Sequence, residues 1–176
     1  MDPNLERERS NIDFEANKGI RYHAYRRSFF DGIDNFFKIS TIVTGTSVFV
    51  TIVGEHTFAA QVLALLVAVL SAADVVFRFS IRSRDHDALY HDYSRLAQEI
   101  AKNTRPTEAD IALWKARRLE IEMNEPGIIE LLERRCAAEE ATAQGRPLRD
   151  QWRLSRWQIL FSQWAIWPAL PQNLAS

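Results

Sequence analysis

The chain has 176 residues, a length that accommodates one domain and argues against a multidomain enzyme. Its formal net charge of -1 gives no electrostatic reason to expect nucleic acid as a partner. Cys136 is the only cysteine, which excludes an intrachain disulfide and is typical of a reducing compartment.

The first predicted element is a polar N-terminal segment, residues 1–19. Met1 to Asn17 show no sustained hydrophobic periodicity, so we expect them to fray or to form a short exposed helix. From Ile20 onward, large apolar residues recur at three- and four-residue spacings, which predicts a helix with an aromatic face. These residues are Tyr22, Tyr25, Phe29, Phe30, Ile33, Phe36 and Phe37.

Two uncharged apolar runs follow, Ile39 to Gly54 and Thr57 to Ala73. A run of this length forms about 25 Å of helix, somewhat less than the roughly 30 Å thickness of the hydrocarbon core. Flanking aromatic side chains, and charged side chains that extend toward the headgroups, make up the difference. We therefore expect two transmembrane helices, at about residues 36–54 and 57–79.

The connection between the runs is only Gly54 to Thr57, which predicts two antiparallel neighbours, a transmembrane hairpin. Neither Lys nor Arg lies between Ile39 and Phe77, whereas basic residues precede and follow that stretch. The positive-inside rule then predicts a multi-pass protein of the cell (inner) membrane with both termini in the cytoplasm. Asp74 and Arg78 are expected to neutralise each other. The juxtamembrane charges are Arg26, Arg27, Lys38, Asp74, Arg78 and Arg82.

The alternative is a soluble helical bundle whose core contains these two helices. A core helix of that kind normally keeps one polar face. The stretch from Val62 to Leu70 has no polar face, which favours acyl chains as its surroundings.

The remaining chain predicts a cytoplasmic helical extension over residues 81–145, so the expected fold class is all-α. Helices are expected over Ile81 to Lys102, over Thr107 to Asn124 with a capping box of Thr107 and Asp110, and over Ile128 to Gln144. The apolar stripe of the first consists of Leu89, Tyr93, Leu96 and Ile100, and the apolar markers of the second are Ile111, Trp114 and Ile121. Together with the hairpin they form one domain, residues 20–145.

Residues 146–176 form a Trp-rich amphipathic C-terminal segment. Its large apolar residues share one helical face, which either lies in the membrane interface or packs against the cytoplasmic helices, and both readings stay open. The residues of this face are Trp157, Leu160, Phe161, Trp164 and Trp167.

Two stripes of small residues follow the expected spans. The second span carries an alanine at every fourth position, a pattern typical of close helix packing in membranes. The first span carries a stripe of hydroxyl groups that would line a pore if several hairpins assembled. The alternative is local, because Ser and Thr in membrane helices commonly donate to carbonyls of their own helix. The alanines are Ala60, Ala64, Ala68 and Ala72, and the hydroxyl residues are Ser40, Thr44, Ser47 and Thr51.

A dense group of His and Asp residues, Asp85 to Asp92, is the one feature that suggests a metal site. His86 and His91 are five residues apart and so lie on different helix faces, which favours a solvated juxtamembrane surface. The sequence shows no Gly-rich phosphate loop, nucleophile elbow or catalytic triad. We therefore expect a protein that is not an enzyme and has no catalytic residues, no cofactor and no metal.

Three segments carry a resemblance to a known family. They are Arg21-Tyr22-His23-x-x-Arg26-Arg27, Asp87-x-Leu89-x-x-x-Tyr93-x-x-Leu96, and Arg118-Leu119-x-Ile121-Glu122-x-Asn124-Glu125-Pro126 followed by Leu132 and Cys136. With the hairpin, they resemble the SLATT family of two-transmembrane effector domains from bacterial conflict systems, over about Arg21 to Gly145. The resemblance implies a membrane-perturbing effector that a cytoplasmic nucleotide-signalling protein triggers.

The expected function is that of an effector in the lipid bilayer that forms a homo-oligomer and perturbs or permeabilises the cell membrane in a bacterial defence system. The first alternative is a non-conducting membrane anchor or scaffold that recruits a cytoplasmic partner. A phage-type holin is the third reading, and it fits less well because holins depend less on a folded tail as long as Ile81 to Gln144.

Overall fold

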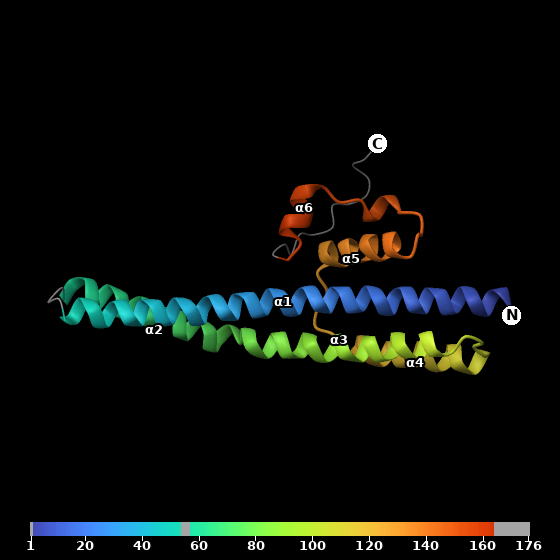
Figure 1. Cartoon of the computed structure of the whole chain (residues 1–176), viewed down its shortest axis with the longest axis horizontal. Helices are drawn as coiled ribbons and strands as arrows, with labels where there is room; N and C mark the ends of the chain where they lie inside the picture. The colour runs from blue at the N-terminus through green and yellow to red at the C-terminus, as the bar shows by residue number, and fades with distance from the viewer. Residues whose placement is uncertain (1, 54–56, 164–176) are drawn as a thin grey trace. The chain divides into compact units, whose positions relative to one another are not determined.

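A computed structural model describes residues 2–53 and 57–163 of the chain, and over these residues the protein is helical without any strand. This confirms the predicted all-α class. The elements are α1 (Pro3–Val53), α2 (Thr57–Phe77), α3 (Phe79–Lys102), α4 (Glu108–Met123), α5 (Glu130–Ala143), the 3-10 helix η1 (Asp150–Trp152) and α6 (Arg156–Phe161) (Figure 1). The connection at residues 54–56 and the segment 164–176, which includes Trp164 and Trp167, lie outside the described residues.

The chain divides into two compact units, and each is described by itself. The first unit consists of Met1–Tyr25 and Asp87–Ser176, and the second consists of Arg26–His86. The predicted boundaries, at residues 19 and 145, differ from this division. Helix α1 crosses from one unit to the other without a break, because nothing in its sequence between Pro3 and Val53 ends a helix.

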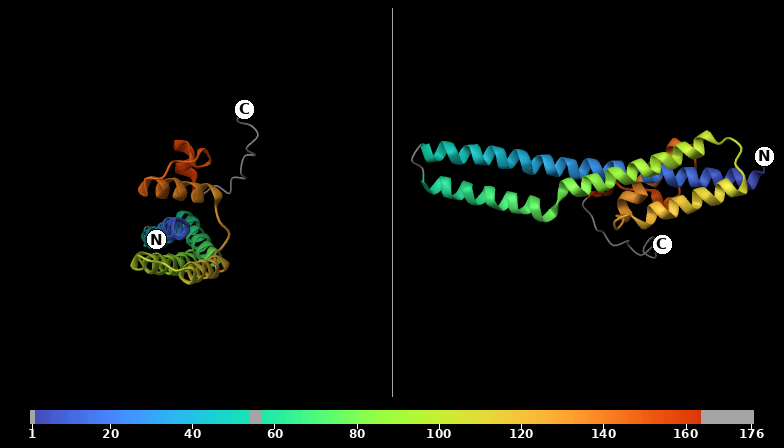
Figure 2. Two further views of the ribbon diagram at one scale, coloured as in Figure 1. Left: turned by 90° about the vertical axis from the view of Figure 1, so that its right-hand side faces the viewer. Right: turned by 90° about the horizontal axis from the view of Figure 1, so that it is seen from below.

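In the first unit, the N-terminal part of α1 is the central element. Helices α3 and α4 lie on one side of it and α5 lies on the other (Figures 1 and 2). The main core joins α1 to α3 and α4, and two smaller clusters join α1 to α5. The predicted apolar residues of α3 and α4 are all part of the main core. It consists of Ile12, Ala16, Leu89, Tyr93, Leu96, Ile100, Ile111, Trp114 and Ile121.

The prediction of a frayed or short exposed helix at the N-terminus is wrong from Ile12 onward, whereas most side chains of residues 3–11 are exposed as predicted. Ile12 and Ala16 are buried against α3 and α4, whereas Phe14 is buried against α5. At about 100° per residue, Phe14 points away from Ile12 by more than half a turn, so the two buried faces of α1 are nearly opposite. A helix with two opposite buried faces lacks the single apolar stripe that a search for amphipathic periodicity detects.

Local sequence signals fix the ends of α4 and α5. The predicted capping box is present, since Thr107 Oγ1 accepts from the Asp110 backbone amide at 3.3 Å and Asp110 Oδ2 accepts from the Thr107 amide at 2.8 Å. Beyond α5, Gly145 adopts a positive φ of 65° and the Arg146 amide donates to the Ala141 carbonyl at 2.8 Å. This is the Schellman arrangement, for which glycine is the favoured residue.

In the second unit, α2 runs antiparallel to the C-terminal part of α1 (Figure 2). The predicted second helix was expected to continue to Phe79, but α2 ends at Phe77 and α3 begins at Phe79, with Arg78 at a φ of 50° between them. A non-glycine residue in the left-handed region breaks a helix. After this break, the first turns of α3 pack on α1. Ser83 Oγ donates to Asp31 Oδ1 at 2.5 Å, and the His86 ring stacks on the Phe30 ring with 5.6 Å between the ring centres.

Candidate functional site

The most prominent surface of the second unit is apolar and exposed. Among the described residues, one helical stretch, Phe58–Lys102, is long and apolar enough to cross a membrane, and only 6% of its most apolar window is buried. Large hydrophobic side chains on α2 and on α1 from Ile39 to its C-terminal end are also exposed. They include Ile39, Ile42, Val43, Phe49, Val50, Ile52, Phe58, Val62, Leu65, Leu66, Val69, Val75, Val76 and Phe77. An apolar surface of this extent marks contact with another apolar phase, either lipid or protein.

The alanine stripe of α2 and the hydroxyl stripe of α1 occupy different environments. Ala60 is buried, whereas the other three alanines, Ala64, Ala68 and Ala72, are exposed. Three of the four hydroxyl residues, Ser40, Thr44 and Ser47, are half-buried. The side chain of Thr51 lies outside the described residues.

The local alternative for the hydroxyl groups finds direct support at one predicted position. Ser47 Oγ donates to the Val43 carbonyl at 2.9 Å, and the neighbouring Thr46 Oγ1 donates to the Ile42 carbonyl at 2.9 Å. In both bonds the hydroxyl group donates to a carbonyl four residues earlier in α1 itself.

Three of the predicted juxtamembrane charges, Arg26 and Lys38 of α1 and Arg82 of α3, lie near aromatic or acidic groups of the second unit. The Arg26 guanidinium lies 4.5 Å from the centre of the Phe30 ring, and the Arg82 guanidinium lies 5.9 Å from the same ring. Lys38 forms an ion pair of 2.6 Å with Asp34, one turn earlier on α1. Sequence reasoning did not single out Asp34, although its four-residue spacing to Lys38 is a signal for such a pair.

The remaining juxtamembrane residues behave differently from the prediction. Within the described residues no ion pair joins Asp74 to Arg78, because the helix breaks at Arg78 and the two side chains lose their common helix face. The backbone amide of Arg78 still donates to the Asp74 carbonyl at 3.0 Å. Arg27 is half-buried on α1.

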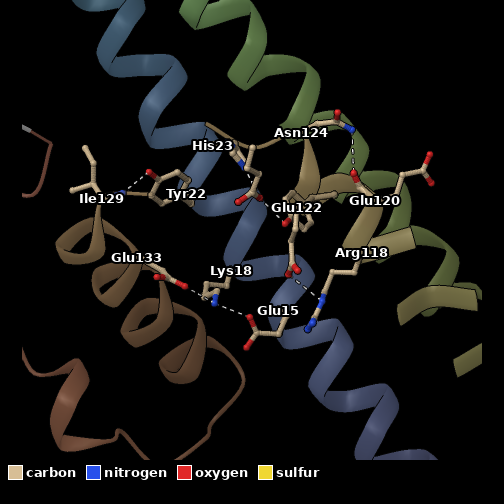
Figure 3. Close-up of polar contacts among 12 residues, drawn as sticks. Glu15, Lys18, Tyr22, His23, Arg118, Glu120, Glu122, Asn124, Ile129 and Glu133 are labelled. Carbon is tan, nitrogen blue, oxygen red and sulfur yellow. Dashed lines mark hydrogen bonds and ion pairs between the residues drawn. The ribbon is translucent and has the colours of Figure 1, made fainter. Parts of the chain in front are cut away.

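A buried polar cluster occupies the first unit, and it joins the three segments that carry the family resemblance. His23 of α1 and Tyr93 of α3 both contact Glu125, which follows α4. Tyr93 Oη donates to Glu125 Oε1 at 2.6 Å, and His23 Nε2 lies 3.1 Å from the same oxygen. Because an ionised carboxylate only accepts hydrogen bonds, we assign the Nε2 proton to His23. Figure 3 shows His23 directed at the segment that follows Asn124.

The packing around this cluster is tight. The His23 ring stacks on the Tyr93 ring at 5.7 Å, and the Tyr22 ring meets His23 edge-on at 5.2 Å. A Cβ atom at Gly19 would lie 2.9 Å from three carbons of the Tyr93 ring, so only glycine leaves room for Tyr93 against α1. On the α5 side, the Ile129 amide donates to Tyr22 Oη at 3.0 Å.

Burial and hydrogen bonding together set the proton affinity of the cluster. Burial of the Glu125 carboxyl acts to raise its pKa, but the hydrogen bonds from His23 and Tyr93 outweigh burial and hold the pKa below its ordinary value. Burial also raises the pKa of Tyr93, and the hydrogen bond to the negative Glu125 raises it further. At neutral pH the cluster therefore contains a carboxylate and a neutral phenol.

A cavity of about 350 Å³ opens beside the cluster. Lys18 lies at its wall and joins two helices, because its ammonium group is 2.6 Å from Glu15 of α1 and 2.9 Å from Glu133 of α5 (Figure 3). The segment between α4 and α5 is thus held at one end by Glu125 and at the other by Ile129. The arrangement fixes how α5 attaches to α1.

Neither family models nor curated proteins nor solved structures match the chain.

Within the cluster, the Tyr93 hydroxyl serves as a hydrogen-bond donor to the Glu125 carboxylate. Among residues 2–53 and 57–163, no group of three or more His, Cys, Asp or Glu side chains is placed to hold a metal ion.

The Asp85 to Asp92 group is split by its helix. His91 and Asp87 are largely exposed and lie 3.8 Å apart, as expected for a solvated surface. The expectation is wrong for His86, which is buried against Phe30. Cys136 is a buried core residue, and burial raises the pKa of its thiol to about 12.

Proposed function

We propose that this protein is a membrane effector: a two-span helical hairpin that assembles in the bilayer and permeabilises it. The observation that carries the proposal is the exposed apolar surface of α2 and the C-terminal part of α1. Transferring such side chains from water to an apolar phase gains about 1.5–3 kcal/mol each at full burial, which for this surface amounts to on the order of 20 kcal/mol. A bilayer supplies that phase on every side of the hairpin.

Orientation and location follow from charge. Basic residues flank the apolar stretch on both sides and are missing within it, which supports a hairpin with both termini in the cytoplasm of the cell (inner) membrane. The first unit would then be the cytoplasmic part that receives a signal. The resemblance to the SLATT family supports a nucleotide-signalling protein as the source of that signal.

Assembly is supported by the exposed alanines. Ala64, Ala68 and Ala72 do not pack against α1, so a helix of a second copy can approach α2 closely along them. The described hydroxyl residues Ser40, Thr44 and Ser47 are half-buried in this structure, so they would line a pore only after α1 rotates or its neighbour moves away. We therefore propose a closed state, which this arrangement represents, and an open oligomeric state.

A membrane anchor or scaffold is the second candidate, and one observation favours it. Helix α4 exposes Leu113, Leu119 and Met123, and the following segment exposes Ile128. Exposed large apolar side chains on the first unit offer a surface for a protein partner. In this candidate the hairpin localises the protein and conducts nothing.

Liposome experiments distinguish the two candidates. The full chain is reconstituted into dye-loaded liposomes, chemically crosslinked to promote assembly, and tested for leakage. We expect leakage by the wild type and none by Ala64→Leu/Ala68→Leu, because the larger side chains block close helix packing. Ala59→Leu, on the opposite face of α2, is the matched control and should leak normally.

Each other outcome removes a specific part of the proposal. Insertion of the protein without leakage, even when crosslinked, refutes the effector and leaves the anchor. Equal leakage by Ala64→Leu/Ala68→Leu and by the control Ala59→Leu refutes packing along the alanine stripe. A chain that stays monodisperse in detergent-free buffer after high-speed centrifugation refutes membrane insertion itself.

A further inference from the structure

A second cavity in the first unit, of about 610 Å³, has an unusual charge distribution. It lies between α1, α4 and the segment that follows α5, and its size falls within the range of small-molecule sites. Four basic residues line it: Lys115, Arg118, Arg146 and Arg149.

Two of these cations already have acidic partners. Lys115 pairs with Glu8 at 2.9 Å, and Arg118 pairs with Glu122 at 3.1 Å. Glu15, the other acidic residue of the lining, pairs with Lys18 at 2.6 Å. The carboxylates at the cavity are therefore neutralised by cations other than Arg146 and Arg149.

The other two cations have no carboxylate partner among the described residues. Arg146 donates to the Ser10 carbonyl at 2.5 Å and to the Ser10 hydroxyl at 2.6 Å, both of which are neutral acceptors. Arg149 lies 5.0 Å from the Trp152 ring and forms no ion pair in the described part of the chain. In the described part of the chain neither guanidinium thus forms a direct ion pair, and Arg146 is attracted to the Asp13 carboxylate only at longer range.

Contacts with aromatic rings position these two charges at the cavity. The Schellman turn at Gly145 places Arg146 over the Phe14 ring of α1, at 4.7 Å. Phe14 in turn stacks on Trp152 at 5.7 Å, and Trp152 contacts Arg149. The stacked rings connect α1 to η1 and hold the two arginines at the same cavity. Preorganised donors of this kind lose little entropy when they bind a ligand.

We propose that this cavity binds a small anion that carries phosphate groups. The planar guanidinium fork matches the oxygens of a phosphate, and a phosphate group or chain with two or more charges can neutralise Arg146 and Arg149 together. Lys115 and Arg118 lie close enough to the same space to exchange partners with a larger polyanion. The phosphate belongs either to a soluble phosphorylated compound or to a lipid headgroup. The site lies within the first unit, so it stands independently of the proposed membrane activity.

Calorimetry on the full chain in detergent micelles tests the soluble source, with tripolyphosphate as the probe. We expect saturable binding that weakens about tenfold in Arg149→Gln, because one charge-assisted hydrogen-bonding partner is lost. Arg149→Lys keeps the charge without the fork and should bind with intermediate affinity. Arg95→Gln, an exposed arginine of α3 outside the cavity, is the matched control and should bind like the wild type.

Native mass spectrometry tests the lipid source by counting phosphatidic acid molecules that the solubilised chain retains, with phosphatidylcholine as the reference lipid. Binding that depends on Arg149 supports the site in either experiment. Dependence with tripolyphosphate alone favours a soluble phosphorylated compound, and dependence with phosphatidic acid favours a lipid headgroup. Binding that falls equally in Arg149→Gln and Arg95→Gln reflects net charge alone and overturns the proposal. Absence of binding by the wild type in both experiments overturns it as well. Because Arg149 is exposed and makes no ion pair with any described residue, an unchanged melting curve is expected for its variants.

Discussion

The buried hydrogen bond between Tyr93 and Glu125 gives the sharpest test of how the first unit is held together. In Tyr93→Phe the ring and its stacking on His23 remain, and only the 2.6 Å bond to the carboxylate is removed. Glu125 then keeps His23 as its remaining side-chain donor. Because Glu125 is almost fully buried, water replaces the lost bond poorly.

The expected loss in the free energy of unfolding is about 2 kcal/mol, in the range for a hydrogen bond to a charged group. For a domain of roughly 100 residues, each kcal/mol lowers the melting temperature by about 4–8 °C, so we expect a decrease of about 10 °C. Circular dichroism at 222 nm, recorded on the full chain in micelles at pH 7, measures this decrease.

The pH dependence provides an independent signature of the same bond. The pKa of Glu125 in the folded state lies below its ordinary value of 4.5. Its carboxylate therefore contributes stability that is present above pH 4.5 and is lost as the pH falls through the folded-state pKa. The difference in melting temperature between wild type and Tyr93→Phe should be largest above pH 4.5 and should narrow as the pH falls below 4.5 through the folded-state pKa of Glu125, because the protonated carboxyl forms a weaker, neutral bond.

Tyr25→Phe is the matched control, because Tyr25 also donates to a carboxylate, Glu139, at 2.9 Å. Here Glu139 is 31% exposed and keeps an ion pair of 2.9 Å with Arg135, so the expected loss is about 1 kcal/mol or less. A loss in Tyr93→Phe no larger than that in Tyr25→Phe, or one that does not change with pH, would refute the reasoning.

Two further predictions follow from the packing. Gly19→Ala should destabilise the protein by about 1–3 kcal/mol in thermal unfolding, because the added Cβ meets the buried Tyr93 ring. Gly32→Ala is the control and should be neutral or stabilising, because its added Cβ meets nothing within 4 Å. Equal effects of the two substitutions on stability would contradict the close contact at Gly19. Cys136 is fully buried and its thiol pKa is raised to about 12, so alkylation by N-ethylmaleimide at pH 8 should be at least about 100-fold slower in the folded protein than in urea. Rapid alkylation of the native chain would show that α5 detaches from α1.

The sequence predicted well the elements whose signals are local. The capping box at Thr107 and the stripe from Leu89 to Ile100 on α3 both appear as expected, since hydrogen bonds and helical spacing act over four residues. The buried cluster is a different case. His23, Tyr93 and Glu125 each stood in a segment that carried the family resemblance, but their meeting depends on contacts between residues up to 102 positions apart. Spacing along the chain contains no information on such contacts.

The same distinction applies to the molecule as a whole. The order of residues along the chain determined by itself that the protein is helical and that one stretch has no polar face. Apolar runs and helical periodicity are properties of residues that are close in the sequence. Only the tertiary structure decided that the charged N-terminus is a central helix with Ile12 and Phe14 buried on nearly opposite faces. It also decided that Ala64 is exposed while Ser47 is half-buried. Which face of a helix is covered depends on the elements around it, and those are brought there by the packing of the entire chain.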